Sequence, residues 1–155
     1  MQIRTLESIL ADQPILQGLQ PRHLALLAGC ASNAVFQPGQ FLFHEGHPSG
    51  QFFLMRTGGV AIQLVSAGRG ALTLETVGPG ELLGWSWLFP PHRWRFDARA
   101  LELTRVISFQ GECLRAKCDE DLELGYEFLR RFAQVVVRRL EATRLQLLDL
   151  YGPGR

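Results

Sequence analysis

The segment Val77–Leu82 (VGPGEL) has residue types that suit a binding loop for an anion. Gly80 carries no side chain, so the backbone there can approach a ligand closely. We expect the residues after Gly80 to begin a short helical turn, whose free N–H groups could receive a phosphate. The segment is therefore a candidate site for a small phosphate-bearing ligand.

Two arginines, Arg93 and Arg95, lie further along the chain from that loop. On a strand from 93 to 99, side chains alternate between the two faces, so the charged residues would share one face and the apolar residues the other. Asp97 would lie on the charged face, where an ion pair with Arg95 would use part of the arginine's charge.

No catalytic constellation accompanies these residues. The sequence has no GxSxG, HExxH, P-loop or paired-carboxylate motif. His44 and His47 lie three residues apart, which is a weak metal signal, and with Glu45 they are too close together for the spread ligand set of a metal-holding cupin. We therefore expect no enzymatic activity, no metal and no catalytic residue.

The composition describes an ordinary globular domain. The chain has 155 residues, of which 46% are hydrophobic and 20% charged, and its formal net charge is +1. A chain of this length can bury a substantial core, and its balanced charge gives no footprint for sequence-independent binding to nucleic acid. The sequence shows no signal peptide and no run of roughly 18 apolar residues that could span a membrane. We expect a soluble, cytoplasmic protein with no membrane association.

The cysteines, Cys30, Cys113 and Cys118, are three in number and have no CxxC spacing. An odd count without that spacing argues against a disulfide framework or a zinc site. We expect reduced thiols, as is usual in cytosolic proteins, with Cys113 and Cys118 packed as small apolar residues.

The apolar pattern changes twice along the chain. Helical spacing covers about 4–32, with an interruption at Asp12–Pro14, and it returns at about 112–151, where we expect Gly125 to separate a short helix from a long one. Between about 34 and 110, short apolar runs alternate with glycine and proline, as in an antiparallel sandwich or barrel. The expected strands cover 41–43, 52–54, 60–62, 64–65, 72–74 and 106–109. We predict one α+β domain over 1–155, an antiparallel, jelly-roll-like β-roll flanked by N-terminal helices and a C-terminal helix.

The order of these parts resembles the cyclic-nucleotide-binding domain of the Crp/Fnr regulator superfamily. The segments that carry the resemblance are 37–46 (QPGQFLFHEG), 52–58 (FFLMRTG) and 77–82 (VGPGEL). The resemblance implies that cAMP or cGMP binds to the cassette after the glycine turn. The ligand-binding residues that it implies are Gly80, Glu81, Leu82, Leu83, Gly84, Arg93, Arg95 and Thr143.

Roles follow from the resemblance for three of these positions. Glu81 would accept a hydrogen bond from the ribose, one of the two arginines would neutralise the cyclic phosphate, and Thr143 would contact the adenine amine. The chain departs from the family where an Arg-Ser/Thr-Ala triplet is usual, since Trp94 and Phe96 follow its arginines. That departure leaves open which arginine faces the phosphate.

Two features have a second interpretation that needs no ligand. The Glu81 carboxylate could cap its own turn. The aromatic residues of the cassette could form a platform for a planar ligand, but aromatic side chains usually serve burial, so we favour rings that fill the pocket. These residues are Trp85, Trp87, Phe89, Trp94 and Phe96.

Two functions follow from these readings. One is a ligand-sensing regulatory domain that signals through its C-terminal helix, which pairs with a second copy in a homodimer. The alternative is a degenerate β-roll that serves as a protein-interaction or assembly module. The sequence stops at Arg155 without a helix-turn-helix segment, so we expect no direct DNA binding and an output through a downstream protein partner. We expect the arginines of this amphipathic helix to form its solvated flank. They are Arg130, Arg131, Arg138, Arg139 and Arg144.

Overall fold

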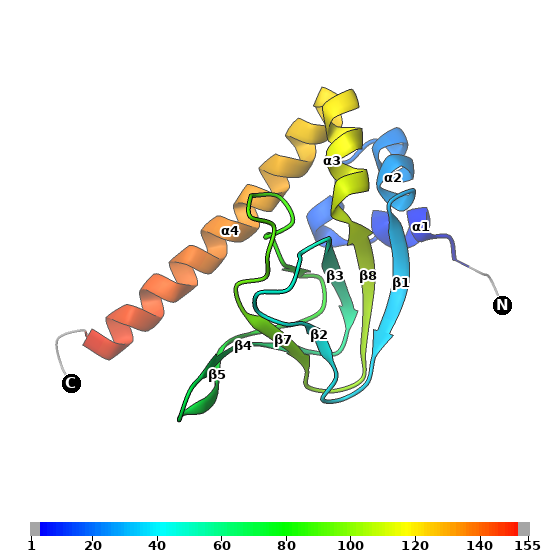
Figure 1. The fold of residues 1–155 in the computed structure, drawn as a ribbon. Helices are drawn as coiled ribbons and strands as arrows, with labels where there is room; N and C mark the ends of the chain where they lie inside the picture. The colour runs from blue at the N-terminus through cyan, green and yellow to red at the C-terminus, as the bar shows by residue number, and fades with distance from the viewer. Residues whose placement is uncertain (1–3, 152–155) are drawn as a thin grey trace.

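The computed structural model describes residues 4–151, with helical segments at both ends and strands between them (Figure 1). The helical segments are α1 (Leu6–Ala11), a 3-10 helix (Pro14–Leu16), α2 (Pro21–Ala28), α3 (Gly111–Glu120) and α4 (Leu122–Tyr151). The strands are β1 (Ala31–Phe36), β2 (Phe41–Phe43), β3 (Gln51–Thr57), β4 (Val60–Ser66), β5 (Gly70–Val77), β6 (Leu82–Leu83), β7 (Asp97–Ala100) and β8 (Thr104–Gln110). This order confirms the predicted fold class.

The strands form two four-stranded antiparallel sheets, ordered β1-β8-β3-β6 and β2-β7-β4-β5. Strand β3 belongs to the first sheet and is buried on both faces. Phe53 and Met55 point into the core between the two sheets, whereas Phe52 and Leu54 point into the core beneath the helices. Because successive side chains on a strand point to opposite faces, this one apolar run supplies both cores.

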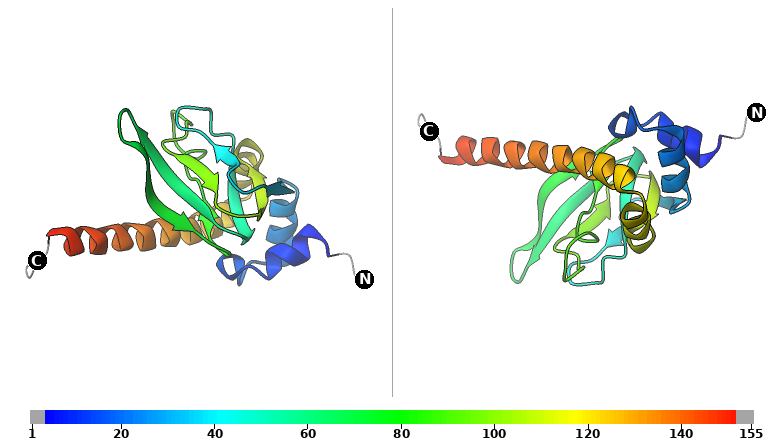
Figure 2. Two further views of the ribbon diagram at one scale, coloured as in Figure 1. Left: turned by 90° about the horizontal axis from the view of Figure 1, so that it is seen from below. Right: turned by 90° about the horizontal axis from the view of Figure 1, so that it is seen from above.

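The helices cover the outer face of the first sheet (Figure 2). Leu10 of α1, Leu27 of α2 and Leu114 of α3 join Phe128 and Phe132 of α4 in that core. From Val136 to Tyr151 the side chains of α4 are exposed apart from Arg139, which is partly buried, and the C-terminal end of the helix projects past the β-roll (Figure 2). Between residues 4 and 151, no helix is long and apolar enough to cross a membrane.

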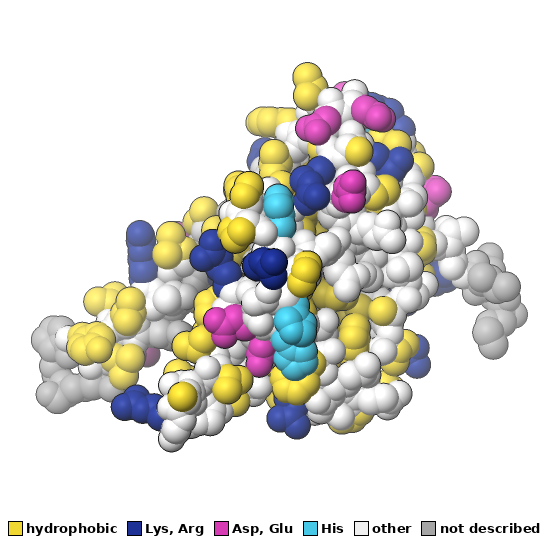
Figure 3. Space-filling model, in the orientation of Figure 1, with side chains coloured by type: hydrophobic (Ala, Val, Ile, Leu, Met, Phe, Trp, Pro, Cys, Tyr) yellow, Lys and Arg dark blue, Asp and Glu magenta, His cyan; other side chains and the backbone are white. Residues whose placement is uncertain are grey.

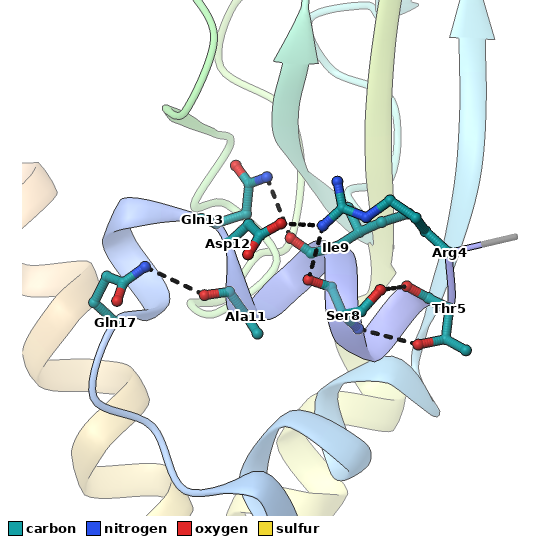
Figure 4. Close-up of polar contacts among 8 residues, drawn as sticks. All are labelled: Arg4, Thr5, Ser8, Ile9, Ala11, Asp12, Gln13 and Gln17. Atoms are coloured by element: carbon teal, nitrogen blue, oxygen red, sulfur yellow. Dashed lines mark hydrogen bonds and ion pairs between the residues drawn. The ribbon is translucent and has the colours of Figure 1, made fainter. Parts of the chain in front are cut away.

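Local hydrogen bonds fix the N-terminal helix (Figure 4). The Thr5 side-chain oxygen accepts from the Ser8 backbone N–H at 3.2 Å and caps the first turn. Arg4 forms an ion pair with Asp12, and the Gln17 side chain donates to the Ala11 carbonyl at 3.2 Å. The helix ends at Ala11, so the interruption predicted at Asp12–Pro14 is confirmed.

Of the segment 93–99, whose side chains we considered as they would lie on a strand, only the part from Asp97 belongs to a regular strand, β7. The preceding segment contains Pro90 and Pro91, which lack a backbone N–H for a sheet, and His92 has a positive φ of 55°. The Trp94 backbone instead bonds to the turn after β2, donating to the His47 carbonyl at 3.0 Å. The predicted alternation survives without a strand, since Trp94 is buried and both of its arginine neighbours are exposed.

The prediction of reduced thiols is wrong for two cysteines, because Cys30 and Cys113 form a disulfide. Their Cα atoms are 5.7 Å apart although 83 positions separate them in the sequence. Only the fold brings them together, and spacing rules carry no information about such a pair. Cys118 is the free cysteine of the described residues.

The predicted division of the C-terminal helices is right, but it lies at Asp121 and not at Gly125. The Asp121 carboxylate accepts from the Leu124 backbone N–H at 3.1 Å and caps the start of α4. This hydrogen bond, with help from Arg22, holds the pKa of Asp121 below its usual value. Gly125 lies inside α4, where a Cβ would come within 3.1 Å of the Cys118 carbonyl oxygen, so it allows α3 and α4 to approach closely.

Arg131 is buried, although the helical pattern predicted a solvated flank for it. It is 8% exposed, and its guanidinium donates to the Gln17 carbonyl at 2.7 Å and to the Glu127 carbonyl at 3.0 Å. Its neighbour Arg130 is exposed and contacts only the Glu127 carboxylate. Arg131 therefore fastens α4 to the segment that precedes α2.

Replacing Arg131 by Met should lower the free energy of unfolding by about 1–3 kcal/mol, because two carbonyls lose a charged donor in a water-poor setting. The matched control, Arg130→Met, should leave that free energy nearly unchanged, since it removes an exposed ion pair. Urea unfolding followed by circular dichroism measures both. Equal losses in the two variants would contradict the role given to Arg131.

Candidate ligand-binding cavity

A cavity of about 450 Å³ lies between the second sheet, the loop that follows β6, and α4. We call this space the central cavity, and residues 84–96 the cassette loop. The sheet contributes Phe43, Ile62, Leu74 and Glu75 to the lining. The α4 helix contributes Val136, Arg139, Leu140, Thr143 and Gln146. The lining is mostly apolar, with charges only from Glu75, Arg95 and Arg139.

The cavity brings together half of the predicted site residues. Those that line it are Leu83, Gly84, Arg95 and Thr143, whereas Gly80, Glu81, Leu82 and Arg93 lie outside the lining. The glycine turn precedes the residues that line the cavity, whereas the cassette loop forms part of the cavity wall.

The residues after Gly80 do not form the predicted helical turn. Leu82 and Leu83 pair with β3 as strand β6, and both side chains are buried. A turn comes later, where the Leu88 backbone N–H donates to the Trp85 carbonyl at 3.1 Å. Burial of two successive leucines at the sheet edge outweighs the local preference that the glycine suggested.

Glu81 closes its own turn. Its carboxylate accepts from the Gly78 backbone N–H at 3.0 Å, and its carbonyl accepts from the Met55 backbone N–H at 2.9 Å. The interpretation that needs no ligand therefore describes its position. Ribose recognition by Glu81 stays a prediction, for which the hydrogen bond from Gly78 to one carboxylate oxygen leaves acceptor capacity on the other.

The two candidate arginines have different surroundings. Arg93 donates to the Gly46 carbonyl at 2.7 Å, away from the cavity. Arg95 lines the cavity and is exposed, and within residues 4–151 its side chain forms no hydrogen bond or ion pair. Asp97 does not pair with it, because that carboxylate accepts from the Glu45 backbone N–H at 2.7 Å and faces His44. Arg95 is thus the cassette arginine whose charge is available to a ligand.

Arg139 is a site residue that the sequence analysis missed by placing it on a solvated flank. It is largely buried; its guanidinium donates to the Leu82 carbonyl, lies 4.0 Å from the Glu75 carboxylate and stacks over the Trp85 ring at 5.3 Å. Burial lowers the pKa of Arg139 from its usual value, although nearby carboxylates partly oppose this shift. Helical spacing could have found it, because Arg139 lies four residues before Thr143 and so shares its face.

The aromatic residues of the cassette loop are divided between the core and the cavity wall. Trp87 is buried in the core beneath the helices, whereas Trp94 is buried and lines the cavity with Trp85 and Phe96. Phe89 is 62% exposed. The prediction that these rings fill the pocket is therefore wrong, because the pocket stays open.

Gly84 sets the position of Trp94. Its φ is +92°, and a Cβ there would lie 2.7 Å from an atom of the Trp94 ring. That ring stacks on Phe43 with the centroids 3.7 Å apart. A side chain at position 84 would therefore push Trp94 off the wall of the cavity.

The Gly84→Ala variant should lose about 2–5 kcal/mol of unfolding free energy, because left-handed strain and overpacking add. Its near-ultraviolet circular dichroism should change as Trp94 moves. Gly80→Ala is the matched control, since Gly80 has a φ of +84° with open space around it. It should lose only about 1–2 kcal/mol and keep the wild-type aromatic spectrum; a spectrum of Gly84→Ala that matches the control would refute the packing argument.

Residues 34–121 match the family model of the cyclic nucleotide-binding domain. The chain belongs to this family. It is 30% identical over 154 residues to the CRP-like cAMP-activated global transcriptional regulator of Mycobacterium tuberculosis, covering 97% of this chain and 66% of that protein. The chain thus spans slightly less than two thirds of the length of the curated relatives that it matches.

Solved structures give the same result. The N-terminal domain of a transcriptional regulator from Streptomyces coelicolor superposes with a TM-score of 0.68 at 26% identity, covering 95% of this chain and 99% of that one. The catabolite activator protein of Thermus thermophilus gives 0.70 at 27% identity, covering 88% and 62%. These matches confirm the Crp-like resemblance and the β-roll. They are regulators and not enzymes, in agreement with the prediction of no enzymatic activity.

Proposed function

We propose that the chain senses a cyclic nucleotide in the central cavity and transmits its presence through α4. The observation that carries this proposal is that α4 forms one wall of the cavity and the cassette loop forms another. A bound ligand contacts both walls at once. If it fits one position of α4 better than another, it shifts the helix toward that position.

The charges of the cavity suit a phosphate. Arg95 is accessible and unpaired within residues 4–151, so it offers charge-assisted hydrogen bonds without losing an existing partner. Arg139 is already engaged with the Leu82 carbonyl and Glu75. An anion near Arg139 competes with these contacts, and they are the polar contacts that join α4 to the sheet at the cavity. This competition gives the ligand a physical means of repositioning the helix.

The Thr143 hydroxyl, one of the polar groups that α4 contributes to the cavity lining, favours an amine. The Thr143 hydroxyl donates to the Arg139 carbonyl at 2.9 Å, which leaves its oxygen as an acceptor. An adenine presents a donor amine there, whereas guanine presents a carbonyl at the same ring position. We therefore propose cAMP before cGMP as the ligand, in line with the cAMP-activated relative.

Calorimetric titration with cAMP tests the proposal. Arg95→Gln should weaken binding about 10- to 100-fold, because a charged partner of the phosphate is lost. Arg93→Gln is the matched control and should bind as the wild type does, because Arg93 is turned to the Gly46 carbonyl.

The titration also has an outcome that overturns the proposal. If the wild type shows no heat and no change in tryptophan fluorescence at millimolar cAMP or cGMP, the cavity is not a nucleotide site. The assembly-module alternative then takes its place. Equal weakening by the two arginine variants would show that Arg95 is not the phosphate partner.

A second feature favours an assembly role for α4 with or without a ligand. Several large apolar side chains of α4 are at least half exposed (Figure 3). They include Val137, Leu145, Leu147, Leu148, Leu150 and Tyr151. This much exposed apolar surface on one helix favours an interaction site. We propose that it pairs with a second copy in a homodimer, that output passes from there to a downstream protein, and that the protein works in the cytoplasm.

Leu148→Glu should dissociate the homodimer, because a carboxylate in an apolar helix interface is costly to desolvate. Size-exclusion chromatography with light scattering measures the mass. Gln134→Glu adds the same charge at an exposed position nearer the start of α4 and should keep the wild-type mass. The wild type should be measured at several concentrations that span 100-fold within the micromolar range. A monomeric mass at all of them would refute the homodimer.

A further inference from the structure

The Cys30–Cys113 disulfide joins two parts of the helical layer. Cys30 lies between α2 and β1, and Cys113 lies in the first turn of α3. Backbone hydrogen bonds surround the bond on both sides. The Gln110 N–H donates to the Cys30 carbonyl at 2.9 Å, and the Gly111 N–H donates to the Gly50 carbonyl at 2.9 Å. The disulfide therefore fixes where α3 starts.

The same turn of α3 supports the cassette loop through Trp87. A Cβ on Gly111 would lie 3.0 Å from the Trp87 Cβ, so this tryptophan packs directly on the helix start. Arg115 donates to the Trp87 carbonyl, and His92 Nδ1 lies 2.9 Å from that oxygen. Trp87 also stacks on Phe52 of β3 with ring centroids 4.7 Å apart. Cys113 thus lies on the element that holds the loop beside the central cavity.

The two cysteine residues differ in exposure. Cys30 is 4% exposed, whereas Cys113 is only partly buried. We therefore place the first attack of a reductant at Cys113. The third cysteine does not compete, because burial, aided by Asp119 and Asp121, raises the pKa of the Cys118 thiol and keeps it from forming the reactive thiolate.

We propose that the Cys30–Cys113 disulfide is a thiol–disulfide exchange site that controls how firmly the cassette loop is held. A thiolate of a dithiol reductant attacks Cys113 Sγ and forms a mixed disulfide, and Cys30 leaves as a thiolate that takes a proton from water. The second thiol of the reductant then resolves the mixed disulfide, which releases Cys113. In total the protein gains two electrons and two protons, and the dithiol becomes a disulfide.

Reduction removes the covalent tie while the hydrogen bonds around it remain. The start of α3 then becomes free to fluctuate, and Trp87 and the cassette loop fluctuate with it. In the cytoplasmic location proposed above, such a bond is expected to be transient and redox-sensing rather than permanent. Any effect of reduction on ligand affinity rests on the proposed function. The expected motion of the cassette loop does not depend on that function.

Hydrogen exchange measured by mass spectrometry on the whole protein tests the proposal, with and without dithiothreitol and without nucleotide. Thiol counting in denaturant without reductant should give one free thiol before treatment and three after it. Amides of peptides covering 84–96 and the first turn of α3 should exchange at least about fivefold faster after reduction. The melting temperature should fall by about 5–15 °C.

Two variants complete the test. Cys118→Ala retains the disulfide and should show the full response to dithiothreitol. The double variant Cys30→Ala with Cys113→Ala should exchange as the reduced protein does, with no response. Three free thiols before treatment, or a bond that the native protein keeps in excess dithiothreitol, would overturn the proposal. So would a lower melting temperature with unchanged exchange at 84–96, which marks a bond that only stabilises. Because no nucleotide is present, none of these results depends on cAMP binding.

Discussion

Burial of β3 on both faces is the constraint on which the rest of the structure depends. Phe53 and Met55 hold the second sheet, while Phe52 stacks on Phe109 and Trp87 and anchors the helical layer. From Phe52 to Met55 the strand has no solvent face, so each of these side chains must match a partner from another element. The glycine turn, the cassette loop and α4 are all placed by contacts with this strand or with its immediate neighbours.

The sequence predicted the elements whose own residues carry the pattern. The apolar runs at 52–54, 60–62 and 106–109 became strands because burial on both faces leaves a continuous run of apolar residues in the sequence. Strand β1 (ASNAVF) was missed, since it lies at a sheet edge and has few buried side chains. Strand β6 was missed because it is defined by its partner, with two leucines paired to β3.

The candidate site was predicted less well, for a physical reason. Helical periodicity shows which residues share a face, but it does not show which face the fold will cover. Arg131 and Arg139 therefore looked solvated, although one supports Gln17 and the other contacts Leu82 and Trp85. The disulfide was out of reach for a similar reason, since its two cysteines are brought together by the pairing of β1 with β8. Only the fold distinguishes the two cassette arginines, because Arg93 donates to the Gly46 carbonyl and Arg95 does not.

These tertiary contacts also explain how a pocket can remain in a loop so rich in aromatic residues. Trp87 and Trp94 pack onto Phe52 and Phe43, so each has a partner in the sheet and neither needs to occupy the space beneath α4. Trp85, Trp94 and Phe96 line the cavity together with Arg95 and Arg139. Arg139 joins α4 to Leu82, whereas Trp87 packs the cassette loop against the start of α3 and against Phe128 and Phe132 of α4. Under the two proposals, a ligand would act on the contacts of Arg139 and a redox change on the packing of Trp87, and both would alter the same cavity.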